Sequence, residues 1–483
     1  MEKIYLSVQT SLIITIVVGV FFITLGYINL KKKSANINYI VGDRSETVFS
    51  LTTSLSASAL GAWILFGPAS AATWGGIGAV VGYALGTAAP MLFLINFGPK
   101  IRKEFPKGMS LTEFVKKRFG TKILKIILFL TLFYLIIFLI AEITAISFLL
   151  NLISKTPLFI TSGLTLTICL LYILKGGFKL SIITDKYQFM IISILILLSL
   201  LWILGKLEIS SVELIKNNSP HLLNKNYISN YTAGLTFFIA VAATNLFHQG
   251  NWQRVFAAKN TFILKKSLLY SSIISFLIVL WMGYTGLVSF AIDPQVIPDL
   301  AFFNLILINE NFFLIVAILI LAIALTLSTI DTLINAISSL IIIDGKVVNK
   351  YFTGKKIQDK TNKVVLILCL LVFIFASQGF SILYLFLIAD LLCCSAVITI
   401  FYGFYKKKID SKLAIISILS GLISGLLFFP SQNFQSSILV GNIISIDSLS
   451  PFISTNLLFI SFAVSLILPM IIIIFHSLRN SLR

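Results

Sequence analysis

Apolar stretches of about 20 residues, separated by short polar connectors, recur along almost the whole chain. An α-helix needs about that length to cross a bilayer, and lipid cannot hydrogen-bond an unpaired backbone group. The pattern therefore predicts an all-α integral membrane protein with about 13 transmembrane helices. We place these spans near residues 4–29, 47–71, 76–98, 123–153, 157–174, 184–204, 231–249, 264–291, 312–343, 363–379, 381–405, 409–429 and 452–478.

Composition agrees with this class. Hydrophobic residues make up 58% of the 483 positions and charged residues only 11%, whereas soluble domains carry about 25% charged residues. The chain is expected to form one continuous bundle rather than separate soluble domains. Its four cysteines all fall in apolar runs and show no disulfide or metal-binding spacing.

The distribution of charge predicts how the chain lies in the membrane. Lys and Arg number 37 against 18 Asp and Glu, an excess that could indicate nucleic acid. However, the basic residues gather in every second connector, and basic connectors face the cytoplasm. We therefore expect a multi-pass protein of the cell (inner or plasma) membrane, with the N-terminus outside and the C-terminus cytoplasmic. We expect the lipid bilayer and a small-molecule solute as partners, and no nucleic acid. We also expect the chain to be a monomer.

The ninth span carries polar side chains at its centre. An intramembrane carboxylate indicates a functional site by default. Leu325, Ser328 and Thr329 stand at i, i+3 and i+4 and so share one helix face, and hard oxygen ligands suit a small hard cation. Alternatively, the hydroxyls bond back to carbonyls of the preceding turn. The polar residues of this span are Thr326, Ser328, Thr329, Asp331, Thr332 and Asn335.

The second and seventh spans are also interrupted. Small residues crowd the second span before Gly67 and Pro68, and the seventh contains Gly234, Thr244 and Asn245. Small residues allow close helix packing, which is one explanation. Glycine and proline also let a helix unwind, so that carbonyls can coordinate a cation. Two broken helices five spans apart indicate inverted repeats with a site at the midplane.

Four segments, in this order, resemble the sodium:solute symporters: SASALGAWILFGPASAATWGG, GGFKLSIITDKYQFMI, NWQRVFAAKN and ALTLSTIDTLINAISSLIIID. The resemblance covers most of the chain. It implies a LeuT-like 5+5 inverted-repeat helix bundle. The parts would be an extra helix (1–30), a first repeat (46–205), an external loop (206–230), a second repeat (231–405) and two C-terminal helices (406–483).

The resemblance also implies a Na⁺ site. The family builds this site from carbonyls of the first core helix and from oxygens of the eighth. Matched to this chain, the ligands are the carbonyls of Ala57, Leu60 and Leu325 and the hydroxyls of Ser328 and Thr329.

Two aspartates are expected near the ion path. Asp185 matches an acidic residue that lies on the family's inward path, and its alternative role is to stabilise a helix start. Asp331 lies on a face next to Ser328, where it tunes the ion site or forms structural hydrogen bonds. Glu142 and Asp390 lie inside the fourth and eleventh spans. Three roles stay open for them: contacts to the solute, proton carriers, or buried hydrogen-bonded groups.

The expected substrate pocket lies between the two broken helices. Its residues are Trp63, Phe66, Phe237 and Asn245, with packing as the alternative for each aromatic side chain. One departure from the family concerns the solute. The proline-transporting branch has an aspartate where this chain has Ala59. The stretch TWGGIGAVVGYALGTAAP is similar to the urea-transporting branch.

The resemblance implies a secondary active transporter, not an enzyme. Na⁺ would be the coupling ion for symport of a small polar organic solute by alternating access. Urea, proline or another amino acid, and a small carboxylate are the candidate solutes. A proton-coupled carrier that titrates Glu142, Asp331 or Asp390, and a membrane nutrient sensor built on the same bundle, are the alternatives.

Overall fold

The computed structural model describes residues 4–29, 36–206, 210–307, 311–354, 356–406, 409–432 and 450–481, with Phe434, Ser437 and Leu439. The basic run Lys31 to Lys33 and the predicted boundary at 406–408 lie wholly or partly outside these residues. Within the described part, nine helical segments are long and apolar enough to cross a membrane. They are α1 (Val8–Asn29), α4 (Gly67–Glu104), α5 (Leu111–Ser154), Gly176–Lys206 of α6, α10 (Thr261–Ile292), α12 (Phe312–Val348), α14 (Ile382–Tyr402), α15 (Ser411–Phe428) and Leu457–Arg479 of α17.

The four other predicted spans correspond to helices that are shorter, more polar or broken. They are α3 (Val48–Ala59) with η1 (Ala62–Leu65), the first part of α6 (Leu158–Lys206), α8 (Ile228–Phe247) and α13 (Ile357–Ala376). Short elements connect the spans: α2 (Asn36–Val41), α7 (Ser211–Asn218), η2 (Pro220–Leu223), α9 (Gln249–Ala257), η3 (Pro298–Leu300), α11 (Ala301–Leu307) and α16 (Pro451–Thr455). The last long helix, α17, is Leu457–Ser481.

A glycine with positive φ interrupts each of three long helices. Gly76 in α4 and Gly177 in α6 both have φ near +57°, and Gly120 in α5 has φ +82°. Glycine adopts this left-handed conformation without the steric cost that a side chain brings. Each long helix therefore turns at its glycine and continues as a second segment.

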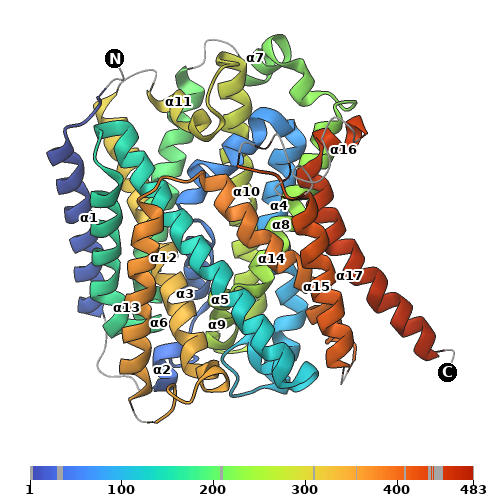
Figure 1. Ribbon diagram of the computed structural model, residues 1–483. Helices are drawn as coiled ribbons and strands as arrows, with labels where there is room; N and C mark the ends of the chain where they lie inside the picture. The colour runs from blue at the N-terminus through green and yellow to red at the C-terminus, as the bar shows by residue number, and fades with distance from the viewer. Residues whose placement is uncertain are drawn as a thin grey trace.

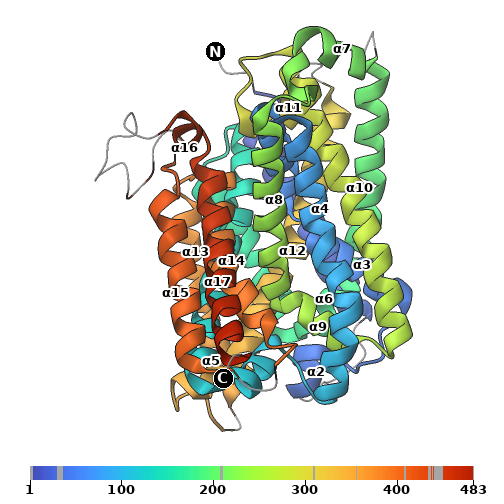
Figure 2. The ribbon, with the colours of Figure 1, turned by 90° about the vertical axis from the view of Figure 1, so that its right-hand side faces the viewer.

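The helices form two groups that meet at α3. In one group α4 packs against α8 and α10, and α3 packs against α10. In the other, α5, α6, α12 and α13 pack against one another. Contacts of α3 with α6 and α12 join the groups. Helix α1 covers α6 and α12, while α14 lies against α5 and α8 and carries α15 and α17 on its outer side (Figures 1 and 2).

Glycine permits backbone contact between α4 and α8. A Cβ added at Gly82 would lie 2.0 Å from the carbonyl oxygen of Gly234, and one at Gly78 would lie 1.7 Å from that of Asn230. Small residues at such crossings let membrane helices approach closely. Helices α4 and α8 are thereby held side by side. The break predicted in the seventh span is wrong, because α8 runs as one helix from Ile228 to Phe247.

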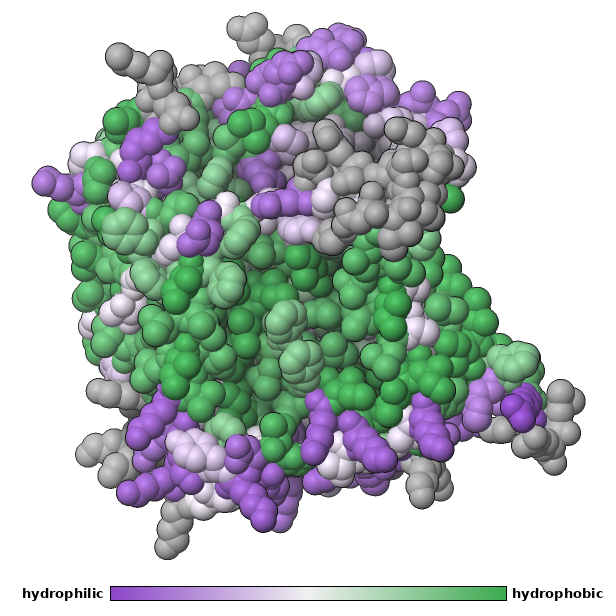
Figure 3. Space-filling view, viewed as in Figure 1, coloured by the Kyte–Doolittle hydropathy of each residue, from purple (hydrophilic) through white to green (hydrophobic). Residues whose placement is uncertain are grey.

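The surface is arranged as a bilayer requires. Figure 3 shows hydrophobic side chains across the middle of one face and hydrophilic ones gathered at its two ends. The N-terminus and C-terminus lie at opposite ends, with α7, α11 and α16 at the N-terminal end and α2 and α9 toward the other (Figure 1). Which end faces the cytoplasm stays a prediction from the basic connectors.

Candidate ion and solute sites

The break in the second predicted span is held open by a carboxylate. Helix α3 ends at Ala59, and Leu60 leaves the helix with φ −107° and ψ 86°. Glu142 of α5 accepts a hydrogen bond from the backbone N–H of Ala62 (2.8 Å). A Cβ at Gly61 would lie 2.2 Å from the Glu142 Oε1 atom, so a larger residue has no room there. Glu142 therefore caps the start of η1 and fixes the break.

Three of the predicted cation ligands meet beside this break. The Ser328 hydroxyl lies 3.0 Å from the carbonyl oxygen of Ala57 and 3.0 Å from that of Leu325. A hydroxyl has one proton to donate, so at any moment one of these two carbonyl oxygens accepts no hydrogen bond from Ser328. Leu60 also belongs to this turn, since its N–H bonds to the Ala57 carbonyl (3.3 Å). The cluster joins α3 to α12 through oxygen atoms, the ligands that hard cations prefer.

The next hydroxyl along α12 is available as a ligand. Thr329 Oγ1 is buried and has no hydrogen-bond partner in the described structure. Buried polar atoms are normally paired, so such an atom calls for an explanation, and a bound ion or water supplies one. The residues present therefore fit the small hard cation that the sequence predicts.

Thr329 also lines a small space that we call the central cavity. It has a volume of about 30 Å³ and lies between α3, η1, α4, α5, α8, α12 and α14. Of the predicted pocket residues, Trp63 and Asn245 line it. Phe66 instead packs against Phe303 (ring centroids 4.9 Å apart), and Phe237 stacks behind Tyr83 (4.7 Å).

A buried ion pair lies nearer the C-terminal end. Arg254 of α9 donates to the Asp185 carboxylate of α6 (2.8 Å), to the Ser54 hydroxyl of α3 (2.8 Å) and to the Thr332 hydroxyl of α12 (3.0 Å). Arg254 and Asp185 are 1% and 0% exposed. The guanidinium thus ties together four helices from both packing groups. Asp185 is therefore one half of a buried ion pair, and its place on an ion path stays a prediction.

Asp331 is held by a separate set of hydroxyl groups. It accepts hydrogen bonds from Ser181 (2.7 Å) and Tyr172 (3.0 Å), both on α6. Thr332 beside it joins Asp331 (3.3 Å) to the Arg254 cluster. The carboxylate therefore fastens α12 to α6, next to the helix turn that carries Ser328.

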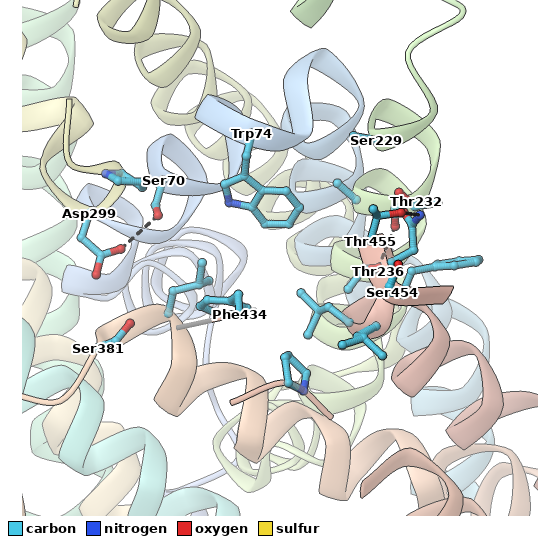
Figure 4. A pocket seen from close by; sticks show the side chains of 18 of the residues that line it. Ser70, Trp74, Ser229, Thr232, Thr236, Asp299, Ser381, Phe434, Ser454 and Thr455 are labelled. Carbon is cyan, nitrogen blue, oxygen red and sulfur yellow. Dashed lines mark hydrogen bonds between the residues drawn. The ribbon is translucent and has the colours of Figure 1, made fainter. Parts of the chain in front are cut away.

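A larger hollow, the outer cavity, lies at the N-terminal end. Its volume is about 380 Å³, and Figure 4 shows Trp74 above it, Asp299 on one side and the hydroxyls of α8 on the other. Asp299 of η3 accepts a hydrogen bond from Ser70 of α4 (2.9 Å). Burial raises the pKa of Asp299 above its ordinary value, and the hydroxyls of Ser70 and Ser381 partly oppose that shift.

The geometry combines a broken helix, an oxygen cluster between two helix groups and a cavity beside it. The sequence profile of the sodium:solute symporter family matches residues 39–421. The chain belongs to the sodium:solute symporter family.

Relatives and solved structures agree with the family. A spermidine transporter of Candida albicans (strain SC5314) is 25% identical over 388 residues, which are 79% of this symporter and 72% of that protein. A substrate-bound, outward-open Na⁺-coupled sialic acid symporter has a similar fold, with a TM-score of 0.70 and 15% identity over 95% of this chain and 96% of that one. A nucleobase-cation-symport-1 family transporter, closed with bromovinylhydantoin bound, gives a TM-score of 0.53 and 13% identity over 92% and 95% of the two chains.

These findings confirm the predicted class: a multi-pass, all-helical membrane protein with the LeuT-like fold, and a secondary transporter rather than an enzyme. The repeat boundaries, the solute, the coupling ion and the site residues stay predictions.

Two residues that the sequence did not single out as site residues lie at or near the proposed sites. Tyr83 lines the central cavity and stacks on Trp63 (5.4 Å), and Arg254 joins four helices. Arg254 lies in the NWQRVFAAKN segment, so its position in a motif was the available signal. Nothing local marks Tyr83, because an aromatic residue in a membrane span is more often a packing residue.

Proposed function

We propose that the protein couples inward movement of Na⁺ to that of a small polar organic solute by alternating access. The observation that carries the proposal is the Ser328 hydroxyl, which lies 3.0 Å from the carbonyl oxygens of both Ala57 and Leu325. This cluster is where the broken helix α3 meets α12. The unpaired Thr329 hydroxyl supplies a further oxygen on the same helix.

Such a site couples ion to solute through the packing of the helices. A cation bound between α3 and α12 holds the two helix groups in one relative arrangement and so favours one state over the other. Thr329 is shared between the ion cluster and the central cavity, so the ion also shapes the wall that the solute contacts. A coupling free energy of about 1–3 kcal/mol is usual for linked sites and would suffice.

One Na⁺ per cycle supplies enough energy. A tenfold concentration gradient gives about 1.4 kcal/mol, and a membrane potential of about 100 mV adds roughly 2.3 kcal/mol. Together these correspond to roughly 500-fold accumulation of a neutral solute.

Candidate solutes for an uptake experiment come from the family resemblance and from the relative described above. Urea, proline, other amino acids and small carboxylates follow from the family resemblance. Spermidine joins them because the relative from Candida albicans is a spermidine transporter.

A proton-coupled carrier is the second candidate. Buried carboxyl oxygens without a partner support it, namely Glu142 Oε1 and Asp390 Oδ1. A proton carrier has to pick up and release its proton, which requires such groups within the membrane. Uptake that follows a pH gradient and ignores Na⁺ would favour this candidate.

Uptake into proteoliposomes tests the proposal. The panel is offered with and without an inward Na⁺ gradient to the wild type and to Ser328→Ala/Thr329→Ala. We expect Na⁺-dependent uptake in the wild type and its loss in the double variant. Ser420→Ala/Ser424→Ala is the matched control, because both hydroxyls bond to carbonyls of their own helix, α15. Na⁺-independent uptake that survives in the Ser328→Ala/Thr329→Ala variant would contradict the proposal.

A further inference from the structure

We infer that the transported solute carries a positively charged ammonium group and that the carboxylate of Asp390 on α14 binds it. The inference rests on the proposed function in one respect, which is that the central cavity holds the solute. It adds the chemical class of that solute and names the residue that selects it.

Asp390 is a buried carboxylate without a cationic partner. Its side chain lines the central cavity and is 4% exposed, and its Oδ1 atom has no hydrogen-bond partner in the described structure. The ion pairs among the described residues involve other acids: Glu104, Asp43 and Asp185. No Lys or Arg is found among the described residues that line the cavity.

The histidine in the cavity wall does not supply the missing charge. Nδ1 of His248 accepts a hydrogen bond from the Gly250 backbone N–H (3.1 Å). A ring nitrogen that accepts a hydrogen bond carries no proton, so this imidazole is neutral. Asp390 therefore faces a cavity wall that contains no positive group.

A carboxylate inside the membrane needs a partner. Acidic residues in membrane spans pair with cations or face a substrate or ion path, because an unpaired charge is costly where water is excluded. The described cavity wall contains no cationic side chain that could pair with Asp390. A cationic group on the solute would complete the pair, whereas an anionic solute would meet a like charge.

The rest of the cavity wall suits an organic cation. Four of the lining residues are aromatic: Trp63, Tyr83, Phe138 and Phe386. The rings of Trp63 and Tyr83 stack with centroids 5.4 Å apart, and Phe138 meets Phe386 edge to face at 4.7 Å. Aromatic faces attract ammonium groups through the ring quadrupole, most strongly where water is excluded.

The size of the central cavity and the charge of the outer cavity agree with an ammonium group. The free volume of about 30 Å³ in the cavity is enough for at least one water-sized group, and an ammonium head is close to that size. Ring contacts join this cavity to the outer one: Tyr83 stacks on Phe237 (4.7 Å), and Phe237 lies tilted against Trp74 (5.8 Å), which lines the outer cavity. The outer cavity has its own carboxylate, Asp299, and no Lys or Arg among its described lining residues. Both cavities therefore favour a cation.

Matched probes that differ in charge test the inference. Proteoliposomes with the full-length protein and an inward Na⁺ gradient are offered ethanolamine against ethylene glycol, and putrescine against 1,4-butanediol. Spermidine, urea, proline and acetate complete the panel. The variants are Asp390→Asn, which removes the charge at constant size, Asp390→Glu, which keeps it, and Asp359→Asn. Asp359 is an exposed carboxylate in the first turn of α13 and serves as the control.

We expect saturable uptake of amines and none of their diols. Asp390→Asn should raise the KM for the amine by about 10- to 100-fold, the usual effect of losing one charged hydrogen-bond partner. Asp390→Glu should keep the preference for amine over diol, and Asp359→Asn should resemble the wild type. Misfolding does not explain such a result, because replacing an unpaired buried charge with a neutral amide removes a cost of folding.

Three results would overturn the inference. They are uptake of a neutral or anionic solute while no amine is transported, an unchanged amine KM in Asp390→Asn, and loss of proton dependence alone in that variant. Failure of the proposed function looks different. Amine uptake that ignores Na⁺ but needs Asp390 would refute Na⁺ coupling and leave the cation site standing.

Discussion

At the scale of single residues, the site combines hydroxyls at the ion cluster with carboxylates elsewhere. Ser328 and Thr329 provide neutral oxygens beside Ala57. Asp185 is neutralised by Arg254, and Asp331 is surrounded by hydroxyls. A cation leaves a neutral hydroxyl site more readily than a site of carboxylates, because less Coulomb attraction has to be overcome. The proposed ion site would therefore release its cation readily, which a transporter requires in every cycle.

The buried ion pair gives a stability prediction. Arg254→Gln leaves the Asp185 carboxylate buried and unpaired, so we expect a loss of about 3–5 kcal/mol of folding stability. Asp185→Asn/Arg254→Gln together should cost clearly less than the arginine variant alone. Thermal unfolding of the purified variants measures the difference. The exposed pair of Lys179 with Asp43 is the control, and Lys179→Gln should cost at most about 1 kcal/mol. A double variant that loses as much stability as Arg254→Gln, or more, would show that the two residues are not coupled.

The raised pKa of Asp299 gives a prediction about pH. Because burial raises this pKa, the carboxyl takes up a proton at a higher pH than an ordinary aspartate does. No other titratable side chain is found among the described residues of the outer cavity. Lowering the external pH from about 7 toward about 4 should therefore raise the KM for an amine in the wild type. Asp299→Asn should show a high KM that changes less with pH. Parallel pH profiles of the two proteins would exclude Asp299 from cation entry.

At the scale of helices, the decisive feature is the break between α3 and α4. Glu142 accepts the Ala62 N–H, and Gly61 leaves room for it. Glycines elsewhere bring α4 against α8, which positions the cavity wall. The Glu142 carboxylate thus stabilises the break, and the glycine contacts fix the neighbouring helices α4 and α8 against each other.

The helix contact predicts a marked difference between two glycines. Gly82→Ala places a Cβ 2.0 Å from the Gly234 carbonyl oxygen, and neither backbone can move aside without separating α4 from α8. We expect a loss of more than about 3 kcal/mol, beyond ordinary overpacking. Gly205→Ala has nothing within 4 Å and lies in α6, so it should be neutral or stabilise by about 0.5–1 kcal/mol. Melting temperatures of the two variants test this, and equal values would contradict the contact.

At the scale of the whole molecule, much of the fold follows from the sequence because the bilayer imposes it. Hydrophobic length predicted the spans, including the second, whose break at Gly61 interrupts the helix. The spacing of Leu325, Ser328 and Thr329 predicted one shared helix face, whereas Ala57 and Leu60 entered the predicted cation site only through the family resemblance. The cavity wall was harder to predict, because Tyr83 and Asp390 lie far apart along the chain and meet only through helix packing. Phe66 and Phe237 look equivalent to Trp63 in sequence, yet packing turns them away from the cavity.

Direct measurement of Na⁺ binding tests the central claim. Purified protein is titrated with radioactive ²²Na⁺, without solute, for the wild type, Ser328→Ala and the control Ser424→Ala. We predict saturable binding in the wild type and in the control, weakened at least about tenfold in Ser328→Ala by loss of one ligand between α3 and α12. Equal Na⁺ affinity in all three proteins would contradict the assignment of the ion site.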